Sequence, residues 1–104
     1  MQLTEFRDLL LSADPQARHY THVKDGKTPY TTWAEYLRMQ GSADNRRNSG
    51  WRIQIDRYTK AEFDPVAERI ETMLDRSDGI TYEYRVDYDQ DSGYIRHTFD
   101  CEAI

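Results

Sequence analysis

The acidic stretch near the end of the chain has the spacing of a calcium ligand set. Asp87, Asp89 and Asp91 repeat the first three ligand positions of an EF-hand loop, in which alternating carboxylates converge on one ion. The pattern then stops, because Ser92 stands where the sharp turn needs glycine and Thr98 stands where the loop needs a bidentate glutamate. We therefore interpret this stretch as a solvated acidic turn and expect no calcium site.

Histidine and cysteine are the other residues that could bind a metal or attack a substrate. His19, His22 and His97 could supply nitrogen ligands to zinc, but a spacing of three residues sends the first two to opposite faces of a strand. Cys101 and His97 could act as thiolate and base, but four residues of extended strand separate them by about 13 Å. We therefore interpret Cys101 as a small buried apolar residue. We expect no metal, no cofactor and no catalytic residue, and predict that the protein is not an enzyme.

The composition indicates one small domain with an acidic surface. The chain has 104 residues, one cysteine and a formal net charge of -5. A lone cysteine cannot form an intrachain disulfide, which fits a reducing cytoplasm. The negative charge argues against direct nucleic-acid binding, which depends on clustered Lys and Arg. The sequence shows neither a signal segment nor an apolar run of the roughly 20 residues that cross a bilayer, so we expect neither standard export nor a membrane partner.

The only pair of adjacent basic residues, Arg46 and Arg47, lies in the polar stretch from Gly41 to Gly50. The simplest interpretation is a solvated flexible connection between two elements. The alternative is a projecting loop that becomes ordered against a partner, as polar segments can.

The second half of the chain predicts a strand followed by a helix. Residues 51–58 alternate Trp51, Ile53 and Ile55 with polar side chains, as a half-buried strand does. Asp64 can cap the first turn of a helix that has Pro65 at its first position, where the missing donor costs nothing. The apolar stripe of this helix consists of Val66, Ile70, Met73 and Leu74.

A hairpin follows this helix. The apolar period returns to two over residues 80–88, and residues 94–101 read as the returning strand. Turn-forming residues fill positions 89–93 between them. The apolar row of the hairpin matches the helix stripe, so we expect the two to be buried against each other.

The first half of the chain allows fewer assignments. Leu3, Phe6, Leu9 and Leu10 suggest a short amphipathic helix, with Thr4 as a possible cap, that ends before the Asp14-Pro15 pair. Residues 18–23 could form a strand, and residues 25–27 a turn.

Residues 30–40 fit two structures. Thr32 and Glu35 form a capping-box pattern that favours a helix. Trp33, Leu37 and Met39 would share one face of a strand, and we favour the strand, largely because of the resemblance described next. These patterns together predict an α+β fold: a small two-layer domain, with a mainly antiparallel sheet and helices packed on one face. Residues 1–104 form a single domain in this interpretation, and residues 41–50 form its flexible polar loop.

Two short motifs flank the predicted helix. The strand before it has the form Arg-x-Gln-x-Asp-x-Tyr, and an acidic turn after it leads into a Gly-aromatic-x-Arg strand. The residues are Arg52, Gln54, Asp56 and Tyr58, and then Asp91, Gly93, Tyr94 and Arg96. With the order of the elements, these motifs resemble the tail-completion, or tail-terminator, proteins of long-tailed bacteriophages.

The resemblance implies a structural phage or prophage protein. Members of that family assemble as a ring, commonly a hexamer, which closes the head-proximal end of the tail tube and joins it to the head connector. The implied partners are further copies of this chain, the tail-tube protein and the head connector protein. The implied locations are the virion and, during assembly, the host cytoplasm.

Our candidates for an assembly interface are Arg46, Arg47 and Asn48. The alternative function is a small acidic inhibitor or immunity protein that blocks a basic enzyme by charge complementarity.

Overall fold

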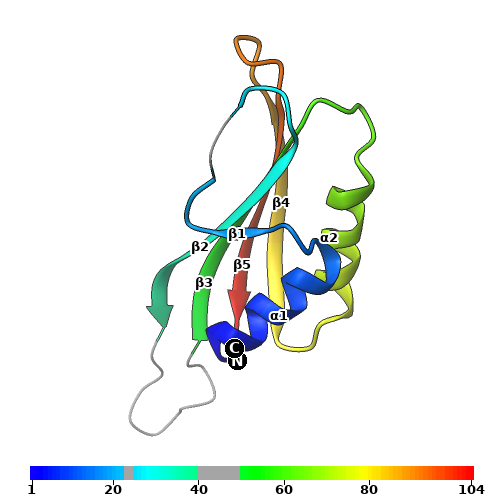
Figure 1. The fold of residues 1–104 in the computed structure, drawn as a ribbon. Helices are drawn as coiled ribbons and strands as arrows, with labels where there is room; N and C mark the ends of the chain where they lie inside the picture. Colours follow the sequence, from blue (N-terminus) through cyan, green and yellow to red (C-terminus); the bar gives the residue numbers. More distant parts are fainter. Residues whose placement is uncertain (23–24, 40–49) are drawn as a thin grey trace, which may run out of the picture.

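The computed structural model describes residues 1–22, 25–39 and 50–104, which form two helices and five strands. The helices are α1 (Leu3–Ala13) and α2 (Pro65–Arg76). The strands are β1 (Arg18–His19), β2 (Tyr30–Met39), β3 (Gly50–Thr59), β4 (Ile80–Tyr88) and β5 (Ile95–Ala103). They form one sheet in the order β1-β2-β3-β5-β4, in which only the β1–β2 pairing is parallel (Figure 1).

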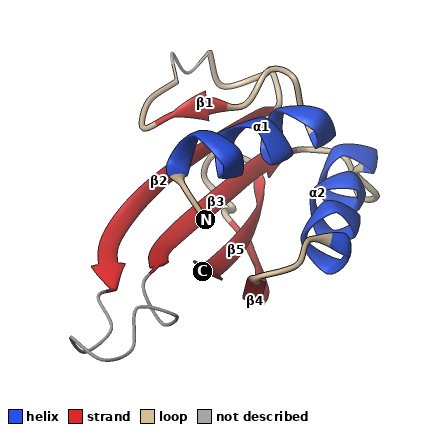
Figure 2. Ribbon diagram, turned by 90° about the horizontal axis from the view of Figure 1, so that it is seen from below, coloured by secondary structure: helices blue, strands red, loops and turns tan. Residues whose placement is uncertain are grey.

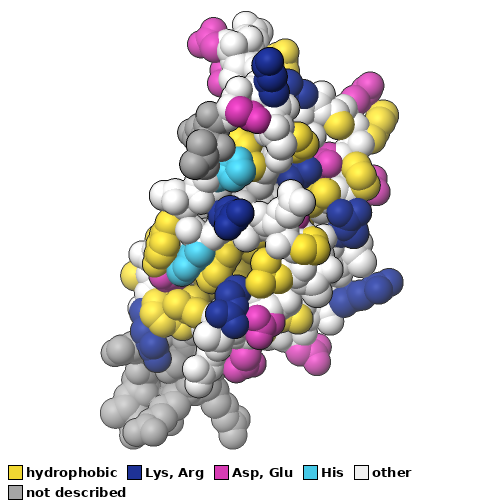
Figure 3. Space-filling model, in the orientation of Figure 1, with side chains coloured by type: hydrophobic (Ala, Val, Ile, Leu, Met, Phe, Trp, Pro, Cys, Tyr) yellow, Lys and Arg dark blue, Asp and Glu magenta, His cyan; other side chains and the backbone are white. Residues whose placement is uncertain are grey.

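Both helices cover the same face of the sheet, and among the described residues no helix lies on the opposite face (Figure 2). The predicted α+β fold, with a mainly antiparallel sheet and helices on one face, is therefore confirmed. We call the two sides of the sheet the helix side and the open face. Basic and acidic side chains are interspersed over the helix side (Figure 3).

The apolar core lies between the helices and the sheet. Its fully buried residues come from every layer: Phe6, Leu10, Ile53, Ile55, Ile70 and Phe99. The alternation predicted for β3 is confirmed, since Ile53 and Ile55 are buried and the residues between them face away. The start of α2 is also confirmed, because the Asp64 carboxylate accepts a hydrogen bond from the Ala67 amide at 3.2 Å.

The first helix ends before Asp14-Pro15 as predicted, but its cap is a different residue. It runs to Ala13, and the residue before its first turn is Gln2, whose amide donates to the Glu5 carboxylate at 3.4 Å. Thr4 lies inside the helix, so its prediction as the cap was wrong.

Of the strand predicted over residues 18–23, Arg18 and His19 form β1, residues 20–22 do not continue it, and Val23 lies outside the described residues. Tyr20 leaves the strand with a φ of 70°, a left-handed conformation, and its amide still donates to the Trp33 carbonyl at 2.8 Å. The turn predicted at Asp25 is confirmed, because its carboxylate accepts the amides of Lys27 and Thr28.

Residues 30–39 form the strand that we favoured, but the predicted face is wrong. The register with β3 shifts between Glu35 and Leu37, as it does at a β-bulge. Trp33 therefore lies on the helix side, whereas Leu37 pairs with Arg52 and shares the open face with it. One extra residue in a strand moves every following side chain to the other face.

The apolar row of β4 is only partly buried, which corrects the prediction that it packs wholly against α2. Ile80 is buried and Tyr82 is half-buried, but Tyr84, Val86 and Tyr88 are exposed. The reason is length, because the 12 residues of α2 span about 18 Å whereas the nine residues of β4 span about 30 Å. The helix cannot cover the whole strand.

Candidate functional site

The open face of the sheet is a surface of regularly placed polar side chains. Alternation along each strand turns the residues between the core positions toward this face. They are Arg52, Gln54, Asp56 and Tyr58 of β3, Arg96, Thr98, Asp100 and Glu102 of β5, and Thr81, Glu83, Arg85 and Asp87 of β4. Two clusters on this face are ordered enough to act as binding surfaces.

The first cluster is centred on the Asp56 carboxylate. Arg96 donates to it from Nε at 3.0 Å, Thr98 from its hydroxyl at 2.9 Å, and Gln54 from its amide at 2.9 Å. Burial opposes the ionisation of Arg96, but the hydrogen bond and the charge of Asp56 outweigh it and raise the pKa of Arg96. These hydrogen bonds hold Gln54, Asp56, Arg96 and Thr98 in place along β3 and between β3 and β5.

Three tyrosines extend this cluster toward the end of the sheet. Tyr30 stacks on Tyr58 with ring centroids 4.5 Å apart, and Tyr94 meets both rings edge-on. The guanidinium of Arg96 lies 5.9 Å from the centre of the Tyr58 ring. Burial raises the pKa of Tyr30 to about 12, so its phenol stays neutral. These rings and Arg96 border a hollow of about 540 Å³ that also reaches Tyr88 and Asp89.

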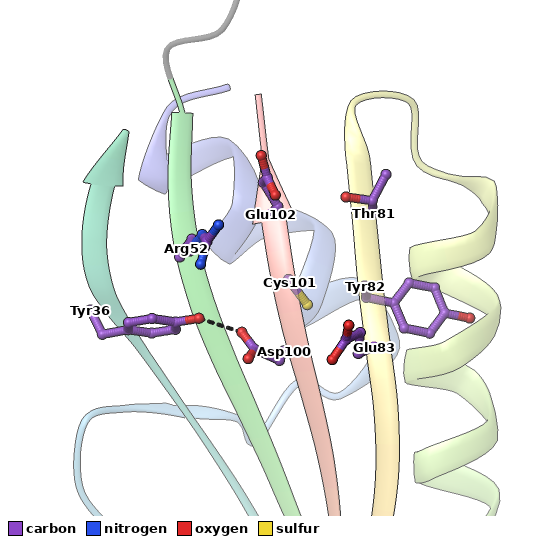
Figure 4. A pocket seen from close by; sticks show the side chains of 8 residues that line it. All are labelled: Tyr36, Arg52, Thr81, Tyr82, Glu83, Asp100, Cys101 and Glu102. Carbon is purple, nitrogen blue, oxygen red and sulfur yellow. Dashed lines mark hydrogen bonds between the residues drawn. The ribbon is translucent and has the colours of Figure 1, made fainter. Parts of the chain in front are cut away.

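The second cluster is a shallow hollow of about 360 Å³, which we call the acidic hollow. Its charged residues are Arg52, Glu83, Asp100 and Glu102 (Figure 4). The Tyr36 hydroxyl reaches across β3 and donates to Asp100 at 2.5 Å. Glu83 and Asp100 are directly opposite each other on β4 and β5. Since like charges in this position repel each other, a cationic group from a partner would be stabilised here.

The side chains that suggested chemistry in the sequence are separated in the structure. The ring of His19 lies 2.7 Å from Glu35, whereas that of His22 stacks on Tyr30. Asp89 accepts the hydroxyl of Ser92 and the amide of Asp91, which fixes its side chain within the turn. Within residues 1–22, 25–39 and 50–104, no group of three His, Cys, Asp or Glu residues is placed to hold a metal ion.

Cys101 and His97 point toward the helix side from the same strand. Cys101 is only 1% exposed, and burial raises the pKa of its thiol to about 12. Burial also lowers the pKa of His97, whose Nδ1 lies 2.5 Å from the Tyr84 hydroxyl. A neutral thiol and an imidazole engaged elsewhere do not make an activated nucleophile.

The predicted assembly residues Arg46, Arg47 and Asn48 lie outside the described residues. Gly50, the last residue of the predicted polar loop, is the first residue of β3.

Sequence reasoning missed a buried ionic group on the helix side. Arg57 continues the row of Ile53 and Ile55, and its guanidinium donates to Asp64 at 2.8 Å and to the Thr31 hydroxyl at 3.3 Å. Asp14 lies 3.9 Å from the same guanidinium. The burial of Arg57 could have been predicted from the strict alternation of β3, which assigns residue 57 to the core side.

No protein-family model matches this chain, and no curated protein matches it significantly. In the described part of the chain, no helix combines the length and the apolar character that crossing a membrane would require.

Proposed function

We propose that this protein is a structural subunit whose activity is association, and that it completes the tail of a long-tailed phage or prophage. In this role it forms a ring that caps the tail tube and joins it to the head connector. The proposal rests on the resemblance and is supported by one observation. The two motifs, some 40 residues apart in the chain, meet on the open face through the bonds of Arg96 and Asp56.

The chemistry of the open face suits a contact surface. Tyrosine and arginine are enriched where proteins bind each other, because they combine a large contact area with hydrogen-bonding groups. Tyr30 and Tyr94 are only 6% and 7% exposed and support this surface from below. The partly exposed Tyr58 is held against them by ring contacts, so it would lose little conformational entropy on binding. In contrast, the thiol of Cys101 is buried and neutral, which does not favour a nucleophilic enzyme.

A ring of identical subunits needs two different patches on each copy, which meet head to tail. We propose the open face as one patch. Arg46 and Arg47 remain our candidates for the second, because a basic pair could meet the carboxylates of the acidic hollow on the next copy. The tail-tube protein and the head connector would bind the two ends of such a ring.

The proposal is tested by mass measurements on the purified protein with tail-tube protein, over a range of concentrations. We expect a closed assembly of several copies on the end of the tube. Replacing both Arg46 and Arg47 with Glu should abolish this assembly, since like charges across an interface cost several kcal/mol. Circular dichroism and thermal melting should be unchanged in the variant.

A matched control separates the open face from the helix side. Glu102→Arg reverses a charge in the acidic hollow and should also prevent assembly, whereas Asp8→Arg on the exposed side of α1 should not. If the wild-type protein never forms an assembly with tail-tube protein, or if Glu102→Arg completes tails normally, the proposed role is wrong.

The acidic hollow also favours a second candidate, an inhibitor or immunity protein that binds a basic enzyme. Glu83, Asp100 and Glu102 would attract cationic side chains of that enzyme. Tight binding to a basic nuclease or toxin encoded beside this protein, together with no interaction with tail-tube protein, would replace the ring with the inhibitor.

A further inference from the structure

The outer edge of β4 is a free backbone surface. β4 is the last strand of the sheet, and within the described residues only β5 pairs with it. Its residues from Glu83 to Tyr88 are exposed on both faces. The strand contains no proline, no lysine and no register shift along its nine residues. Natural sheets use such features to prevent edge pairing, so this edge remains competent to pair.

The bonds at the two ends of β4 show which residues turn their backbone groups outward. The Asp89 amide donates to the Tyr94 carbonyl at 2.9 Å, and the Gly79 carbonyl accepts from the Ile104 amide at 2.8 Å. Antiparallel bonding alternates along a strand, so the odd-numbered residues of β4 bond to β5. Tyr82, Tyr84 and Val86 therefore direct their amides and carbonyls toward the free edge.

The apolar side chains in the second half of β4 are also exposed at this edge. Tyr84 is 40% exposed, Val86 51% and Tyr88 64%. They lie on the helix side beyond the reach of α2. A strand added next to β4 would cover this row and bond the outward backbone groups at the same time.

The charges on the other face of β4 identify the partner strand. Glu83, Arg85 and Asp87 alternate along the strand, and Glu83 faces the like charge of Asp100 on β5. Neither Glu83 nor Arg85 forms an ion pair in the described part of the chain. A strand that is antiparallel to β4 and carries a cation opposite Glu83 would relieve this repulsion.

A second copy of β4 supplies that strand. We propose that two copies of this chain pair through their β4 edges, antiparallel and about a two-fold axis at Tyr84. In this register the Arg85 of each copy lies opposite the Glu83 of the other, so the two-fold axis creates the ion pair twice. Tyr82 of one copy lies opposite Val86 of the other on the helix side.

One other register also pairs opposite charges, and the structure favours it less. A two-fold axis at Val86 would place Arg85 opposite Asp87, but Asp87 already faces Arg96 across the strand pair. That register would leave Glu83 and Asp100 without a cation. The Tyr84 register therefore gives the greater electrostatic gain.

This dimer goes beyond the proposed function and does not depend on it. A two-fold contact joins two copies and cannot by itself close a head-to-tail ring. It would join two sheets into one of ten strands, with both helix layers on the same side and the two open faces side by side.

The test is a charge exchange, measured by sedimentation of the purified protein over a wide concentration range. The wild-type protein should dimerise. Arg85→Glu alone and Glu83→Arg alone should each weaken dimerisation by at least about tenfold, because like charges then meet twice. Circular dichroism should show an unchanged fold in both variants.

Two combinations should restore the dimer. An equimolar mixture of the Arg85→Glu and Glu83→Arg proteins should form mixed dimers, since each carboxylate again meets a cation. The chain that carries both substitutions should dimerise with itself for the same reason. Asp87→Asn is the matched control and should leave dimerisation unchanged, because residue 87 lies opposite Thr81 in this register.

Three results would overturn the inference. These are a wild-type protein that stays monomeric at every concentration, a dimer that survives both single substitutions, and a failure of both combinations to restore it. Loss of the dimer in Asp87→Asn would indicate the register with its axis at Val86 and would equally overturn the register with its axis at Tyr84. All of these measurements use the protein without tail-tube protein, so their failure leaves the proposed ring untouched.

Discussion

Arg57 is the residue on which the two layers depend most directly. Arg57 is 6% exposed, and its guanidinium joins β3 to the cap of α2 through Asp64, which also accepts the Ala67 amide. The loop after α1 contributes a second carboxylate, that of Asp14. A single cation thus compensates carboxylates from two separate segments.

We predict that Arg57→Ala will lower the free energy of unfolding by about 3 to 5 kcal/mol, because it leaves Asp64 and Asp14 buried without their cation. Urea denaturation at neutral pH measures this change. The control is Arg52→Ala on the same strand, where the side chain is exposed and the expected change is within about 0.5 kcal/mol. Similar losses in both variants would show that the buried ion pair is not the cause.

At the scale of elements, α2 holds the helix layer to the sheet through Ala67, Ile70 and Leu74. We predict that Ile70→Ala will destabilise the protein by about 2 to 5 kcal/mol, through lost transfer energy and a residual cavity. Thr72→Ala, on the exposed side of the same helix, should change stability by no more than about 0.5 kcal/mol. A small loss at Ile70 would mean that the stripe does not pack as the structure has it.

The elements that were predictable from the sequence are those with a local signal. α2 has a cap, a proline and a periodic stripe, and β3 has strict alternation, so the start of α2 and, to within one residue, both limits of β3 were predicted correctly. The bulge after Glu35 has no such signal, because it depends on how β2 pairs with β3. For the same reason the sequence could not show that β1 would have only two residues, since its pairing with β2 decides its length.

At the scale of the whole molecule, the candidate site was predictable only in part. Period-two alternation places Arg52, Gln54, Asp56 and Tyr58 on one face, which the structure confirms. The contact between Arg96 and Asp56 could not be predicted without the strand order, in which β5 rather than β4 lies next to β3. The exposure of the second half of β4 could be predicted only from the relative lengths of α2 and β4 and from how they pack, which the sequence does not give.

The whole molecule should lose stability as the pH falls, and the structure indicates two steps. Burial lowers the pKa of His97, so the unfolded chain binds this proton more readily than the folded chain does. Burial of Asp64 opposes its ionisation, but the hydrogen bonds and charge of Arg57 outweigh that effect and hold its pKa below 3.8. In the turns, the Ser92 hydroxyl lowers the pKa of Asp89, and the Thr28 hydroxyl and amide lower that of Asp25 to about 2.

Each of these groups binds protons more weakly in the folded state, so each contributes stability at high pH that is lost on acidification. The His97 contribution is complete above its ordinary pKa of 6.5 and fades below that value. The carboxylate contributions are complete above 3.8 and are lost as the pH falls through their lowered values toward about 2. We therefore predict a shallow fall in unfolding free energy below pH 6.5 and a steeper one below about pH 4.

The measurement is urea denaturation between pH 7 and pH 2, on the wild-type protein and on Asp64→Asn. Asparagine can still cap α2, but it does not titrate and carries no charge to pair with the buried Arg57. The variant should therefore be less stable than the wild type at pH 7. Its stability should then fall less steeply below about pH 4, and the two curves should converge as Asp64 of the wild type becomes protonated. Parallel curves down to pH 2 would show that the carboxylate of Asp64 contributes nothing to the acid sensitivity, and that its bond to Arg57 does not lower its pKa.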